Sequence, residues 1–251
     1  RMVGWAVGAL TLALVVGLYL GPPQGRLRTL GIVCLLAVLV QGGLGGLRVL
    51  VVSNESVRTS VREFLDAGHD LNPVRIGIAI VHAGLAQTVF CLFVAVAILT
   101  SPSWRGEGRP TPHPRAGKVR RLGAMTAVFV FVQLVLGSLA RHTAYTGWIH
   151  IHLLWAFVVV GHVFALVGRA LSVAPETPAI RRPALFLGGL AGVQLCFGVG
   201  AWVARLQSEG SIWTTLVRTS HVAIGAMILA TTVALTLAAH RWLEPAAEAA
   251  A

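Results

Sequence analysis

Apolar residues run along this chain in seven long stretches, separated by short polar segments. Each stretch is close to or longer than the roughly 20 residues that an α-helix needs to cross the apolar core of a bilayer. The composition agrees, because 56% of the residues are hydrophobic, 12% are charged and the mean hydropathy is +0.78. The sequence therefore predicts an all-α polytopic membrane protein, with spans at residues 2–20, 29–52, 75–100, 119–140, 147–171, 183–204 and 216–239.

Basic residues gather in the loops at 21–28, 101–121 and 169–182 and after the last span. Of the 20 Lys and Arg residues, this side holds Arg26, Arg28, Arg105, Arg109, Arg115, Lys118, Arg120, Arg121, Arg169, Arg181, Arg182 and Arg241. The positive-inside rule assigns it to the cytoplasm or matrix. The net charge of +11 therefore indicates membrane topology rather than nucleic-acid binding. We expect a multi-pass protein of a bacterial plasma membrane, or of the mitochondrial inner membrane in a eukaryote.

Two patterns alternate along the chain and form an internal repeat. In the first, a glutamine is followed four residues later by a glycine and then by an arginine: Gln41, Gly45 and Arg48; Gln133, Gly137 and Arg141; Gln194, Gly198 and Arg205. In the second, a histidine is followed four residues later by a small residue: His82 and Ala86; His152 and Ala156; His221 and Gly225. Residues four apart share a helix face, so the small residue leaves room for a large flat ligand. The Gln and Gly pairs have a simpler interpretation as helix-packing contacts.

The nine histidines separate by position. His82, His152 and His221 each lie within about two helical turns of the outer end of a span, roughly 7–11 Å deep, and an ionisable residue inside a membrane is a functional candidate. The other six have simpler interpretations. His69, His113 and His240 are expected at the solvated surface, His142 at the outer mouth near either an anionic group or water, and His150 and His162 in packing or supporting roles.

Three histidines at one depth predict haem ligation, because haem iron accepts neutral imidazole in its axial positions. The two propionates of a haem prefer cationic partners at a polar boundary. Arg48, Arg141 and Arg205 stand at that boundary and are the candidate propionate contacts. The cysteines Cys34, Cys91 and Cys196 are isolated within apolar spans, which favours packing over a zinc site or a disulfide.

Five segments, in order, resemble the haem A synthase family: QGGLGGLRV, VHAGLAQ, LGSLARHTA, IHLLWA and SHVAIGA. The resemblance covers nearly the whole chain. It implies eight spanning helices in two similar four-helix halves, of which this chain would supply the last seven. The divisions would be an N-terminal half-bundle at 1–100, a cytoplasmic or matrix linker at 101–118, a C-terminal half-bundle at 119–243 and a tail at 244–251.

The resemblance also implies roles for individual residues. His82 would bind the substrate, haem O, and His152 with His221 would bind the cofactor, haem b. The activity would be oxidation of a ring methyl of haem O to the formyl group of haem A for terminal oxidases, with haem O supplied by a haem O synthase and an electron acceptor that stays unassigned. The family's glutamate and first ligand histidine would precede Arg1, so no catalytic residue is assigned, and the activity of a chain that begins there is in doubt.

Two other functions fit the same histidines. A di-haem b-type cytochrome would keep both haems and exchange electrons with quinone, and a non-catalytic haem carrier would only hold and deliver them. Prenyl transfer, as in a haem O synthase, is disfavoured because it needs Asp-rich magnesium sites, and the seven spans contain no acidic residue.

The segment at 53–74 is the longest outer loop. Val57, Val61, Phe64 and Leu65 recur there at helical spacing between Asn54 and Gly68. This pattern predicts an amphipathic helix on the membrane surface, acting either as a lid over the substrate haem or as a tether.

Overall fold

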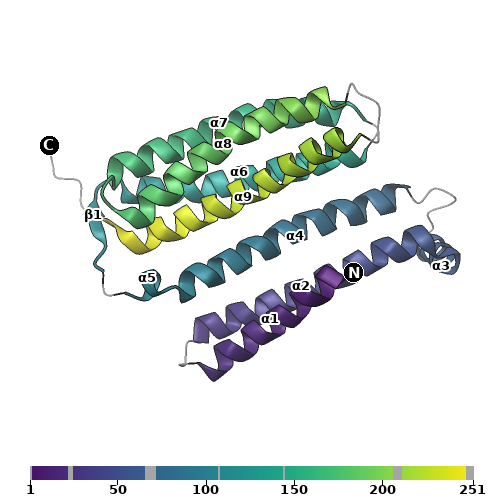
Figure 1. The fold of residues 1–251 in the computed structure, drawn as a ribbon, viewed down its shortest axis with the longest axis horizontal. Helices are drawn as coiled ribbons and strands as arrows, with labels where there is room; N and C mark the ends of the chain where they lie inside the picture. The colour runs from purple at the N-terminus through teal and green to yellow at the C-terminus, as the bar shows by residue number, and fades with distance from the viewer. Residues whose placement is uncertain are drawn as a thin grey trace. The chain divides into compact units, whose positions relative to one another are not determined.

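The computed structural model describes residues 2–21, 25–65, 72–106, 108–143, 145–205 and 211–246. Within these ranges nearly all of the chain is helical (Figure 1). The elements are α1 (Met2–Leu20), α2 (Gly25–Ser53), α3 (Glu55–Leu65), α4 (Asn72–Thr100), α5 (Pro102–Arg105), β1 (Thr111–His113), α6 (Ala116–His142), α7 (Gly147–Val173), α8 (Pro178–Val203), α9 (Ile212–Trp242) and β2 (Leu243–Pro245).

Seven of these helices are long and apolar enough to cross a bilayer: α1, α2, α4, α6, α7, α8 and α9. All seven correspond to predicted spans, so the expectation of an all-α polytopic membrane protein is confirmed. Large apolar side chains such as Trp5, Leu36, Phe157 and Val199 point outward from these helices and are exposed. A bilayer, rather than water, is the solvent that such surfaces require.

The chain divides into two compact units. The first comprises Arg1–Leu99 and Gly137–Trp148, and the second comprises Thr100–Leu136 and Ile149–Ala251. In the second unit, the greater part of α6 and the helices α7, α8 and α9 lie side by side (Figure 1). Its core contains Leu166 of α7, Leu187 of α8 and Leu235 of α9, which are all fully buried.

The amphipathic helix predicted in the outer loop is present as α3. Asn54 precedes it, and its side-chain oxygen accepts hydrogen bonds from the backbone nitrogen of Val57 at 3.2 Å and from the Ser56 hydroxyl at 2.7 Å. This is the N-cap arrangement that satisfies free donors at a helix start. Val57 and Val61 are half-buried, whereas Phe64 is 87% exposed. The side chain of Leu65 and the residues Gly68 and His69 lie outside the described residues.

Arginines satisfy backbone carbonyls at several helix ends. The Arg28 guanidinium donates to the carbonyls of Leu18, Tyr19 and Gly21 at 3.0–3.3 Å, where α1 ends. Arg218 donates to the Ala204 carbonyl at 3.1 Å, where α8 ends. The last carbonyls of a helix have no partner within it, so these cations contribute to stability.

The predicted linker and tail pair with each other at one end of the second unit. Strand β1 from the linker runs parallel to β2, which follows α9 directly. Arg241 donates to the carbonyls of Trp104 and Gly106 at 3.3 and 3.0 Å. Arg120 of α6 donates to the carbonyls of Ala239, His240 and Leu243. These bonds fasten α6 and the linker to the end of α9.

We predict that Arg120→Ala destabilises the second unit, because it leaves three carbonyls without this donor. A hydrogen bond from a charged group contributes about 1.5–3 kcal/mol, so the thermal midpoint in detergent should fall by several degrees. The matched control is Arg121→Ala, which removes an exposed arginine from the adjacent position. Equal midpoints for the two variants, measured by scanning fluorimetry, would show that the Arg120 contacts are not stabilising.

Candidate functional site

His152 of α7 and His221 of α9 face each other inside the second unit. Their ring centroids are 6.4 Å apart, with the ring planes at 79°. Both side chains are half-buried, and the Nδ1 atom of each is inaccessible and has no hydrogen-bond partner. The sequence predicted both residues as ligands, and spacing alone could not establish that they meet. The structure brings them together.

The separation of these imidazoles suits a single metal ion held between them. A metal–imidazole bond is about 2.0–2.1 Å long, which places the centroids of two rings on opposite sides of one metal roughly 6.3 Å apart. Among the described residues, no group of three or more His, Cys, Asp or Glu side chains forms that could hold a metal ion. Zinc needs four ligands, whereas haem iron takes only its axial ligands from the protein. The distance between the two imidazoles is thus compatible with two axial ligands on one haem iron.

A glutamine on a neighbouring helix contacts His152. The Gln133 carboxamide nitrogen lies 3.0 Å from the backbone carbonyl of His152, to which it donates, and 3.4 Å from the Nε2 atom of its ring. The carboxamide oxygen of Gln133 is buried without a partner. This contact ties α6 to α7 at the level of the imidazole and so holds the ring in place.

A glycine admits the ring of His221. A Cβ atom added at Gly198 of α8 would lie 3.3 Å from Cε1 of His221, which is tighter than ordinary van der Waals contact. The space beside Gly225 is occupied by protein atoms, since a Cβ there would lie 3.1 Å from Leu134 and 3.3 Å from the Gln194 carboxamide. The small residue after His221 therefore accommodates Leu134 and Gln194. A flat ligand could use that position only if these two side chains moved.

The first unit repeats this geometry around His82 of α4. The Gln41 carboxamide donates to the His82 carbonyl at 3.1 Å, and a Cβ at Gly45 would lie 3.2 Å from Cε1 of the His82 ring. Nδ1 of His82 is also buried and without a hydrogen-bond partner. The Gln and Gly pattern is thus a helix-packing motif, as its simpler interpretation held, and it also fixes the position of the imidazole.

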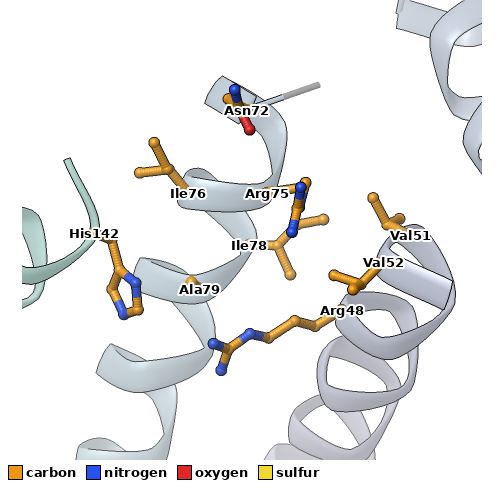
Figure 2. A pocket seen from close by; sticks show the side chains of 9 residues that line it. All are labelled: Arg48, Val51, Val52, Asn72, Arg75, Ile76, Ile78, Ala79 and His142. Atoms are coloured by element: carbon orange, nitrogen blue, oxygen red, sulfur yellow. The ribbon is translucent and has the colours of Figure 1, made fainter. Parts of the chain in front are cut away.

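An open cavity of about 470 Å³ lies in the first unit beside these helices (Figure 2). Its lining combines two arginines, one histidine and one asparagine with an apolar wall: Arg48, Val51, Val52, Asn72, Arg75, Ile76, Ile78, Ala79 and His142. Sequence reasoning identified Arg48 and placed His142 at the outer mouth, and it missed Arg75 and Asn72. Their position at the first turn of α4 was the available signal.

The other candidate residues lie apart from these contacts. Arg141 and Arg205 are exposed, and neither is among the residues that line the cavity. His150 is exposed on α7. Nδ1 of His162 lies 2.8 Å from the carbonyl of Val158 on its own helix, and its ring packs edge-on against Phe129, with centroids 4.6 Å apart. These contacts give His162 a packing role.

Two further histidines, His113 and His240, and the three cysteines lie outside the candidate site. Nδ1 of His113 accepts a hydrogen bond from the backbone nitrogen of Arg115 at 3.0 Å, and His240 is exposed at the end of α9. Cys34, Cys91 and Cys196 are not in disulfide bonds.

Comparison of the chain with protein-family models, with curated proteins and with solved structures finds no match. The site is therefore interpreted from its own geometry.

We predict that Gly45→Val and Gly198→Val each displace the adjacent imidazole and destabilise the protein. Overpacking of this kind typically costs about 1–3 kcal/mol, so the thermal midpoint should fall by several degrees. Gly42→Val and Gly192→Val are the matched controls, because a Cβ at either position meets no atom within 4 Å. Equal midpoints for test and control variants, measured by scanning fluorimetry, would refute the packing role assigned to these glycines.

Proposed function

We propose that this protein is a membrane oxidoreductase of the haem A synthase type, which oxidises a ring methyl of haem O to a formyl group. The observation that carries the proposal is the His152 and His221 pair, half-buried in an apolar bundle at a centroid separation of 6.4 Å. The proposed membrane is the bacterial plasma membrane, or the mitochondrial inner membrane in a eukaryote.

In this proposal the second unit holds the cofactor, haem b. His152 and His221 are its axial ligands, and neutral imidazole is the ligating form. Gln133 and Gly198 position the two rings through the contacts described above. Haem b, when bound, supplies redox chemistry that no side chain of the apolar bundle offers. The protein contributes rigid ligands, a site screened from water and a fixed orientation.

The first unit holds the substrate. His82 has a glutamine neighbour, as His152 does, and a glycine neighbour, as His221 does, so it can present a neutral imidazole to a haem iron. Its unit contains an open cavity, which suits a molecule that must enter and leave. A methyl C–H bond is not attacked by an ordinary acid or base, so two successive hydroxylations followed by loss of water need an oxidant and a source of oxygen atoms. Neither the electron acceptor nor the oxygen source is assigned.

A di-haem b-type cytochrome is the second candidate. The observation that favours it is the repeated geometry, because Gln41 and Gln133 make the same hydrogen bond to His82 and His152, at 3.1 and 3.0 Å. Equal surroundings are what two resident haems would need. The two candidates differ in whether the haem at His82 is chemically changed.

The decisive experiment is product analysis. The full-length protein is expressed in a host that makes haem O but lacks haem A. The extracted haems are then separated by chromatography. We expect haem A or its hydroxylated intermediate. We also expect His82→Ala to reduce this product to background while leaving the haem b of the second unit in place, because His82 ligates the substrate haem and not haem b in this proposal.

His150→Ala is the matched control, since His150 is exposed on α7, and it should leave product formation unchanged. Recovery of haem b alone from the unsubstituted protein, with haem O present and unchanged, would rule out the synthase and favour the cytochrome.

A further inference from the structure

The lining of the cavity in the first unit combines two arginines with several apolar side chains. Arg48 comes from α2, Arg75 from α4 and His142 from the end of α6 (Figure 2). Val51, Ile76 and Ala79 are apolar residues of the same lining. An amphiphile with acidic groups matches both kinds of residue.

Among the described residues that line the cavity, none is an aspartate or a glutamate. The described glutamate Glu55 forms an ion pair with Arg58 of α3 instead. Arg48 and Arg75 line the cavity, and both side chains are exposed. A guanidinium offers a planar pair of donors that matches a carboxylate. Two arginines on separate helices can receive two carboxylates.

The cavity lies close to His82. Ala79 lines it and precedes His82 by three residues on α4, a rise of about 4.5 Å. Arg48 follows Gly45 by three residues on α2, and Gly45 is the residue against which the His82 ring packs. Both helices that position the imidazole therefore also contribute a wall of the cavity, about one turn farther along.

We propose that this cavity binds the two carboxylates of the porphyrin substrate through Arg48 and Arg75, while His82 ligates its iron. The inference rests on the proposed function for the position of the porphyrin, and it adds that the site selects the free dicarboxylic acid. It adds Arg75 to Arg48, which the sequence had already named with Arg141 and Arg205 as a candidate propionate contact. The phosphate of an anionic lipid shares the anionic chemistry, so the test must separate these two sources.

The test uses the full-length protein in nanodiscs of phosphatidylcholine, with the cofactor site already filled. Ferric protoporphyrin IX and its dimethyl ester are titrated separately, and the part of the Soret change that is lost in His82→Ala is attributed to the first unit. Exposed ion pairs are individually weak. We therefore expect Arg48→Gln or Arg75→Gln to weaken diacid binding a few-fold, and the double variant to weaken it roughly 10-fold. Ester binding should stay within about twofold in all variants.

Arg58→Gln is the matched control, because Arg58 is a cation near the same end of α2 that is already paired with Glu55. It should leave the affinities for diacid and ester unchanged. Equal losses for diacid and ester in the double variant would overturn the proposal, because the arginines would then act through structure rather than through the carboxylates. An unchanged diacid affinity in the double variant would overturn it as well.

Repeating the titrations with phosphatidylglycerol in the nanodiscs separates the two anion sources. The proposal predicts that this lipid changes diacid affinity equally in the unsubstituted protein and the double variant. A lipid-dependent loss confined to the unsubstituted protein would assign the cavity to lipid headgroups and overturn the proposal.

The outcomes for the cavity and for the enzyme are distinguishable, because binding is measured without turnover. Arginine-dependent diacid selection without haem A formation would support the cavity and reject the synthase. Haem A formation together with unchanged binding in the double variant would do the reverse.

Discussion

An imidazole nitrogen buried in an apolar bundle without a hydrogen-bond partner costs free energy. Three histidines of this chain, His82, His152 and His221, carry such a nitrogen. The surrounding contacts do not relieve this cost, since Gln41 and Gln133 donate to backbone carbonyls of the histidines. Side chains that bind a metal ion gain a compensating interaction at the ring. In the proposed function, ligation of a haem iron supplies this interaction, and the neighbouring helices hold the rings in place.

The same kind of glutamine and glycine contact positions histidine rings in both units, but the rings are arranged differently in each. A glutamine fixes the backbone at the histidine, and a glycine on the glutamine helix, clearest at Gly45 and Gly198, lets the ring approach. In the second unit two such rings face each other closely, which suits a resident group held from both sides. In the first unit the described contacts place one such ring near an open cationic cavity. In the proposed function, this difference separates the cofactor site from the substrate site.

Much of the fold was predictable from sequence because a bilayer imposes a simple length requirement on apolar segments. The ends were less predictable: α2 begins at Gly25 and α8 at Pro178, whereas hydropathy placed these spans from residues 29 and 183. Both helices extend through polar residues outside the apolar stretch, and α8 continues through Pro183. Hydropathy does not report a helix that projects beyond the apolar layer.

The candidate site was only partly predictable. Local spacing identified the histidines, glycines and glutamines, because residues four apart share a helix face. The approach of His152 to His221 depends on the rotation and tilt of α7 and α9, which no local pattern encodes. The same holds for the cavity, whose Arg48, Arg75 and His142 come from three helices, and for Leu134, which fills the space beside Gly225.

The central claim is that His152 and His221 ligate one haem iron, and electron paramagnetic resonance of the purified ferric protein tests it most directly. The account predicts a low-spin signal of two nitrogen axial ligands from the second unit, which His152→Ala and His221→Ala each abolish while His162→Ala preserves it. A low-spin haem signal that survives both substitutions unchanged would contradict the account.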